Sequence, residues 1–176
     1  MLCLLAAPAN AGHRLEVGVS LAHLDFDEEI RFENDLVYAV HGAAELTPGW
    51  TLGVEVGRVN TRDRLTGGLQ DLSILAIRTR YAPLQDHEWS PLAGAGVNFT
   101  LFEDAPRLDS ISEGFEFALG GEWRFAPGWV LRGEGWLRLQ TINRFEVDES
   151  GVPTGSPEET GYLWSKLLSL GVNRAF

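Results

Sequence analysis

The sequence predicts an all-β protein, namely an eight-stranded antiparallel up-and-down β-barrel that spans a membrane. Three observations predict this fold. Apolar residues recur at every second position in segment after segment, which is the pattern of a strand with one apolar face. The connections between these segments alternate between short and long. The second face of the segments combines small residues with charges of both signs.

Eight segments carry the alternation, and none has a helical period. In the sixth segment, Phe115, Phe117 and Leu119 fall on one face, while Glu116 and Ala118 fall on the other. The segments span residues 15–22, 36–46, 50–57, 75–81, 93–101, 115–125, 129–140 and 164–176. Strands that follow one another in this way form an antiparallel meander, which can close into a barrel.

The connections place all the long loops at one end of such a barrel. The turns Thr47-Pro48-Gly49 and Ala126-Pro127-Gly128 are tight, and the connection at 83–88 is also short. The remaining connections are long and polar, at 25–35, 58–71, 102–113 and 144–160. In an up-and-down barrel, every second connection lies at the same end.

Two barrels fit this pattern: a soluble lipocalin-type barrel with an apolar interior, and a membrane barrel with an apolar exterior. The second face favours the membrane barrel, because its many small residues suit a narrow lumen and the chain has only one Lys to offer a soluble surface. Arg and Glu in such a lumen would neutralise each other. We therefore predict a lumen ion-pair network of Glu16, His41, Glu45, Glu55, Arg78, Arg80, Glu116, Glu122, Arg124, Arg132, Glu134 and Arg138.

Aromatic residues form two predicted belts at the ends of the strands, as expected at the two interfaces of a bilayer. The belt beside the short turns contains Trp50, Tyr81, Trp89, Trp123 and Trp129, and the belt beside the long loops contains Tyr162 and Trp164. Three charges break the apolar face: Arg58, Lys166 and Arg174. We expect each to lie near a strand end, from which a long side chain reaches water.

The N-terminal residues 1–11 are predicted to be the remnant of a signal peptide, and residues 12–176 a single barrel domain. An apolar run ends in Ala9-Asn10-Ala11, which has the small residues of a cleavage site. The alternative is an ordinary apolar N-terminus, because no basic residue precedes the run. Cys3 lies within this segment, so the mature chain would have no disulfide and no thiol site.

The chain carries 25 acidic and 14 basic residues, a net charge of -11. This balance gives nucleic acid no basic surface to bind. The predicted loops at 25–35, 102–113 and 144–160 contain 15 acidic and 3 basic residues. They would attract divalent cations weakly, but they lack the ligand spacing of a defined calcium loop, so we predict no specific metal site and no cofactor.

Two sets of residues resemble known outer-membrane barrels. Leu168, Leu170, Val172 and the final Phe176 alternate in a way that resembles the C-terminal assembly signal of bacterial outer-membrane barrels. Residues 90–105 and 114–141 are similar to a strand and a hairpin of the OmpW family, whose layout is shared by the OmpA and OmpX types. The resemblance implies a Gram-negative outer membrane, periplasmic termini, four extracellular loops, contact with lipid and lipopolysaccharide, and insertion by the barrel-assembly machinery.

Three functions fit an outer-membrane barrel with a charged lumen. The first, which the charged lumen favours, is a monomeric barrel with a closed lumen and a structural or interaction role. The second is a narrow channel for small or hydrophobic solutes, which resemblance to OmpW-like proteins implies. The third is a lipid A-modifying enzyme, for which His41 and Glu45 share a strand face and Ser20, Ser165 and Ser169 lie on predicted neighbouring strands. Because this set faces the lumen and not lipid, we predict that the protein is not an enzyme.

Overall fold

The computed structural model describes residues 14–26, 33–62, 68–84, 87–103, 111–144 and 159–176. No helix long and apolar enough to cross a membrane occurs in these ranges. The described chain forms eight strands: β1 (Leu15–Phe26), β2 (Asp35–Thr47), β3 (Trp50–Arg62), β4 (Leu69–Tyr81), β5 (Trp89–Glu103), β6 (Ile111–Ala126), β7 (Trp129–Arg144) and β8 (Glu159–Ala175). The predicted signal remnant at 1–11 lies outside the described residues.

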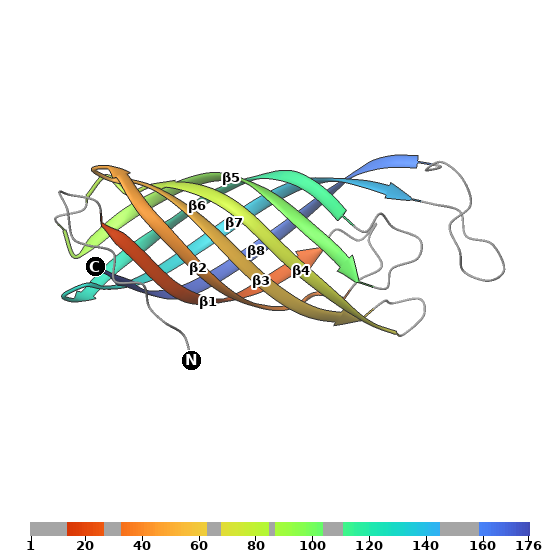
Figure 1. The fold of residues 1–176 in the computed structure, drawn as a ribbon, viewed down its shortest axis with the longest axis horizontal. Coiled ribbons are helices and arrows are strands. Elements are labelled where there is room, and N and C mark those ends of the chain that lie inside the picture. Colours follow the sequence, from red (N-terminus) through yellow and green to blue (C-terminus); the bar gives the residue numbers. More distant parts are fainter. Residues whose placement is uncertain (1–13, 27–32, 63–67, 85–86, 104–110, 145–158) are drawn as a thin grey trace.

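The eight strands form one closed antiparallel barrel in sequence order (Figure 1). Closure is visible at Val19 of β1, which pairs with Val40 of β2 on one side and with Val172 of β8 on the other. Every strand therefore has two hydrogen-bonded neighbours, and the sheet has no free edge. The predicted all-β up-and-down barrel is confirmed.

Two of the short connections are built alike. Thr47 pairs with Trp50 across Pro48-Gly49, and Ala126 pairs with Trp129 across Pro127-Gly128. Each proline fixes φ at the first turn position, and each glycine takes the positive φ that follows, 85° at Gly49 and 73° at Gly128. The residues of these turns, and the described residues of the connection between β4 and β5, lie at one end of the barrel, here called the turn end; the opposite end is the loop end (Figure 1).

The strands extend further toward the loop end than the alternation predicts. β4 begins at Leu69 instead of 75, and β8 begins at Glu159 instead of 164. β3 likewise continues to Arg62, inside the predicted loop 58–71. The prediction was short here because both faces of these strand ends carry residues that do not alternate simply between apolar and polar.

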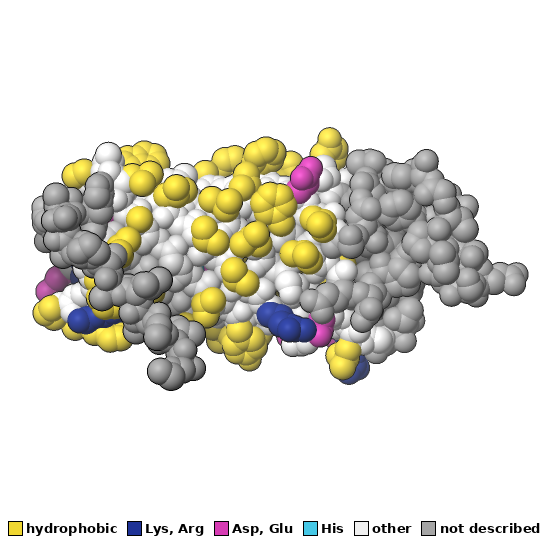
Figure 2. All heavy atoms as spheres, in the orientation of Figure 1, with side chains coloured by type: hydrophobic (Ala, Val, Ile, Leu, Met, Phe, Trp, Pro, Cys, Tyr) yellow, Lys and Arg dark blue, Asp and Glu magenta, His cyan; other side chains and the backbone are white. Residues whose placement is uncertain are grey.

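The two faces of the sheet differ as predicted. Large apolar side chains such as Val19, Phe117, Leu119 and Leu168 point outward and are exposed, and Figure 2 shows hydrophobic side chains spread over the middle of the barrel wall. Ala118 and the ionic side chains of the lumen, such as Arg78, Glu116 and Arg132, point inward and are buried. An antiparallel sheet with its apolar face outside and a polar lumen is the arrangement of membrane-spanning barrels.

Candidate functional site

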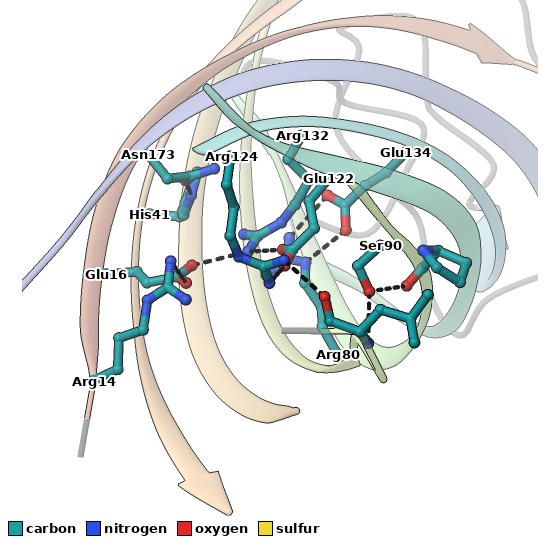
Figure 3. A network of polar contacts seen from close by, with 12 residues as sticks. Arg14, Glu16, His41, Arg80, Ser90, Glu122, Arg124, Arg132, Glu134 and Asn173 are labelled. Carbon is teal, nitrogen blue, oxygen red and sulfur yellow. Dashed lines mark hydrogen bonds and ion pairs between the residues drawn. The ribbon is translucent and has the colours of Figure 1, made fainter. Parts of the chain in front are cut away.

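The lumen is the candidate functional site, because it brings charged side chains from five strands and from the residue before β1 into contact inside the barrel (Figure 3). These side chains form two connected series of ion pairs. The first, here called the central chain, consists of Arg138, Glu116, Arg78, Glu55, Arg80 and Glu134. The second, here called the rim chain, consists of Arg14, Glu16, Arg132, Glu122 and Arg124.

The central chain crosses the lumen between strands that are not neighbours. Arg78 of β4 lies 2.5 Å from both Glu55 of β3 and Glu116 of β6, and Glu116 also accepts a hydrogen bond of 3.0 Å from Arg138 of β7. Arg80 of β4 reaches across to Glu134 of β7 with two hydrogen bonds of 2.6 and 3.1 Å. The chain holds three Arg and three Glu, so its charges balance.

The rim chain lies closer to the turn end. Arg132 of β7 bonds Glu16 of β1 at 2.9 Å and Glu122 of β6 at 3.0 Å. Glu16 also pairs with Arg14 at 3.4 Å, and Glu122 accepts a hydrogen bond from Arg124. With three Arg and two Glu, this chain carries one excess positive charge. Both chains consist of groups that would be costly to bury alone.

A tryptophan lies against the arginines of the central chain. Trp136 of β7 is 2% exposed, and its ring lies 4.1 Å from the guanidinium carbon of Arg78 and 5.4 Å from that of Arg80. Such a position over an aromatic face stabilises a cation. Gly94 of β5 provides the space, since a Cβ atom there would lie 2.9 Å from the Trp136 ring.

Two predicted network members lie elsewhere. His41 is buried and hydrogen-bonds through Nε2 to Oδ1 of Asn173, at a separation shorter than usual. Glu45 lies at the turn end, where its Oε1 accepts a hydrogen bond of 3.3 Å from the backbone N–H of Gly49. The other ten predicted residues all take part in the two ion-pair chains.

The loop-end half of the lumen contains a buried apolar cluster, which the alternation alone did not predict. Leu24 of β1, Val59 of β3 and Leu72 of β4 are each 1% exposed or less. They belong to one buried cluster with Ala22, Phe26, Val37, Ile74, Phe102, Ala118, Trp136, Leu163 and Leu167. Five members of the cluster lie within the predicted strands. The others continue the inward parity of their strands beyond the predicted ends, a signal that was present in the sequence: Leu24, Phe26, Val59, Leu72, Ile74, Phe102 and Leu163.

Several polar atoms between the ionic and apolar parts have no hydrogen-bond partner among the described residues. They include both side-chain polar atoms of Asn98, Oγ of Ser165, Nη2 of Arg138 and Nε1 of Trp136. Sites of this kind normally hold ordered water. Nearer the turn end, the cavity lined by Glu16, Arg80, Glu122 and Arg132, among others, has a volume of about 10 Å³. That is the space of a single water molecule.

The outer wall carries the predicted aromatic belts. At the turn end, Trp50 stacks on Tyr81 with ring centroids 4.8 Å apart, and Trp89, Trp123 and Trp129 are exposed. At the loop end, Tyr162 and Trp164 are exposed on β8.

Lys166 was expected near a strand end, but it lies within β8, which begins seven residues earlier. Its backbone instead pairs with Asp25 near the loop end of the shorter β1. On the same outer wall, Arg58 of β3 pairs with Asp71 of β4 at 2.9 Å. At the other end of the barrel, the guanidinium group of Arg174 lies over Trp129. These outward charges therefore lie toward the ends of the barrel wall.

Acidic clusters do not form a metal site in the part of the chain that the structure describes, where no group of three or more His, Cys, Asp or Glu could hold an ion. The predicted cation-attracting loops fall largely on residues 27–32, 104–110 and 145–158, outside the described residues.

No protein-family model matches the chain, and no curated protein is similar to it in sequence. Solved structures are similar in fold. Neisserial surface protein A (NspA) has a TM-score of 0.64 at 14% identity, over 92% of this chain and 97% of its own. The outer membrane protein AlkL has a TM-score of 0.63 at 15% identity, over 97% and 93%. Outer Membrane Protein W of E. coli has a TM-score of 0.55 at 16% identity, over 89% and 96%. The chain therefore has the fold of the small eight-stranded outer-membrane barrels.

Proposed function

We propose that the protein is a monomeric outer-membrane barrel whose lumen is closed by ion pairs, and that its role is structural or one of interaction. The observation that carries this proposal is the central chain. Arg78 and Arg80 of β4 reach Glu116 of β6 and Glu134 of β7 across the lumen, and Trp136 fills the space beside them. Because these groups obstruct the lumen, solutes would not pass through it easily. The obstruction therefore favours a role in structure or surface contacts over transport.

The outer wall supports placement in a membrane. Its apolar side chains would face lipid, and the aromatic residues at both ends would lie at the two interfaces. We propose that the turn end faces the periplasm and the long loops face the exterior, in contact with lipopolysaccharide. Because the fold neighbours are bacterial outer-membrane barrels, this orientation follows the resemblance to their family.

Conductance in planar bilayers tests the closed lumen. Wild-type protein should give little or no current, whereas a stable open pore would contradict the proposal. The positive control is the triple variant Arg80→Ala, Glu134→Ala and Trp136→Ala, which removes an ion pair together with the ring beside it and so leaves the lumen wider. Heat-dependent gel mobility should first show that both proteins are folded barrels.

The C-terminal residues support assembly by the barrel-insertion machinery. Leu168, Leu170, Val172 and Phe176 all face outward, with Phe176 68% exposed. Deleting Phe176 should reduce the amount of folded barrel in the membrane. Phe125→Ala provides the control, since Phe125 is also an exposed aromatic residue at the turn end. If the truncated chain assembles as well as the intact one, the terminal residues are not the signal.

A narrow conduit for small hydrophobic solutes is the second candidate, and the apolar cluster at the loop end favours it. Leu24, Val59 and Leu72 make this part of the lumen apolar, so a hydrophobic solute that displaced their packing would meet apolar side chains. The experiment is solute flux into liposomes containing the protein. Flux above that of empty liposomes, abolished when the loop-end mouth is blocked, would favour this function over the closed barrel.

We propose no catalytic role for His41. Its hydrogen bond to Asn173 supports a packing role inside the lumen. Lipid A should be unchanged on overexpression of the protein. Altered lipid A that returns to normal with His41→Ala would instead support the enzyme.

A further inference from the structure

The turn end has a hollow of about 570 Å³ between the β6–β7 turn and the end of β8. Its described lining includes two cations, Arg14 and Arg124, three aromatic residues, Phe125, Trp129 and Phe176, and no acidic side chain. In a chain with a net charge of -11, a hollow whose charged side chains are both cations is a local exception. The hollow lies at the turn end of the barrel, and its two arginines are the terminal members of the rim chain. It plays no part in closing the centre of the barrel.

The two arginines differ in how firmly they are held. Arg124 donates to the backbone carbonyl groups of Leu84 at 3.0 Å and His87 at 2.8 Å and also contacts Glu122, so its position is fixed. Its Nε has no hydrogen-bond partner among the described residues. Arg14 is 26% exposed and pairs with Glu16 at 3.4 Å, while Glu16 lies closer to Arg132, at 2.9 Å. The hollow thus has one fixed cation and one that retains donors for a ligand.

The aromatic residues give the hollow an apolar lip on the outer wall. Phe125, Trp129 and Phe176 lie at the turn ends of three successive strands and are 46%, 40% and 68% exposed. Arg174 lies beside them, 5.1 Å from the Trp129 ring, and donates a hydrogen bond of 3.0 Å to the carbonyl of Pro127. A ligand that fits this surface has an anionic group for the arginines and an apolar part for the aromatic lip.

We propose that the hollow binds the headgroup of an anionic phospholipid from the leaflet at the turn end. The phosphate would accept charge-assisted hydrogen bonds from Arg14, with the fixed charge of Arg124 beside it, and the acyl chains would run along Phe125, Trp129 and Phe176. The excess positive charge of the rim chain favours an anion at this place. The inference rests on the proposed membrane placement and is independent of whether the lumen conducts.

The test compares spin-labelled phosphatidylglycerol with spin-labelled phosphatidylcholine in vesicles of phosphatidylcholine that contain the folded barrel. Electron paramagnetic resonance measures the fraction of each lipid that the protein immobilises. Wild-type protein should prefer phosphatidylglycerol about fivefold, the ratio expected for one cation near a membrane surface. Arg14→Gln should bring the ratio close to one.

Arg58→Gln is the matched control, because it removes the same charge from an exposed arginine of the outer wall toward the loop end. It should leave the preference unchanged. Equal loss in both variants, or no preference in wild-type protein, overturns the inference. Loss of the preference on adding excess inorganic phosphate, beyond that caused by sodium chloride of equal ionic strength, shows a site for free phosphate and also overturns it. Failure of membrane placement itself would appear separately, as absence of any immobilised phosphatidylcholine.

Discussion

The two halves of the lumen are filled in different ways. From the middle of the lumen toward the turn end, charged groups such as Glu116 and the arginines around it depend on partners from other strands, so the loss of one group leaves another charge buried. Toward the loop end, Leu24 and Leu72 depend on volume and apolar contact, so a loss leaves a space. Five of the eight strands that supply the apolar cluster also supply the ion pairs, which shows that the wall of the barrel does not dictate what fills it.

The strongest test of this comparison is Glu116→Ala. Glu116 accepts hydrogen bonds from both Arg78 and Arg138, so its removal leaves two buried cations short of a partner. We expect the free energy of unfolding to fall by about 3–5 kcal/mol, measured by urea titration of the folded barrel in lipid. Glu113→Ala on the same strand is the control, since Glu113 is exposed, and it should change stability by less than about 0.5 kcal/mol.

The matching test in the apolar half is Leu72→Ala. Leu72 is 0% exposed, and truncation of such a side chain lowers stability by about 2–5 kcal/mol through lost contact and a residual cavity. Leu69→Ala on the same strand is the control, because Leu69 is 73% exposed. A cost for Leu72→Ala no larger than that of Leu69→Ala would mean that the apolar half is not packed.

Gly94→Val tests the boundary between the two halves, where Trp136 lies. The new side chain would begin 2.9 Å from the Trp136 ring, and overpacking of this kind costs about 1–3 kcal/mol. The Trp136 fluorescence should shift if the ring moves. Gly133→Val is the matched control, because a Cβ atom at Gly133 has no neighbour within 4 Å. Equal effects of the two substitutions on stability would refute the contact with Trp136.

The smallest expected effect is that of His41→Ala. The substitution removes a buried hydrogen bond to Asn173 without leaving a charge unpaired, so the loss should be about 1 kcal/mol. Urea titration measures it, with the exposed His23→Ala as the control. A loss as large as that of Glu116→Ala would place His41 within the ionic half after all.

The wall of the barrel could be predicted from the sequence far better than its filling. Alternation assigns Arg78, Glu116 and Glu134 to the inner face, because the period of a strand is two. It cannot say that Arg78 meets Glu116, since these residues lie on β4 and β6 and their contact depends on the stagger and width of the closed barrel.

The apolar half was missed for a different reason. Val59 lies in the predicted loop 58–71 and Leu72 lies between that loop and the predicted strand 75–81, although in the structure the two residues pair between β3 and β4. The alternation of residues 129–140 assigns Trp136 to the inner face, but its role depends on Gly94, two strands away on β5. Such contacts depend on three-dimensional proximity that a single sequence does not contain.

The ion pairs across the lumen also have a consequence for the order of assembly. Arg132 of β7 meets Glu16 of β1, two strands that become near neighbours only when β8 joins β1. This pair therefore cannot form in a growing, open sheet, where water would still solvate both groups. The ion pair can form only once β8 pairs with β1. The rate at which Glu16 and Arg132 come together would therefore report the rate of barrel closure.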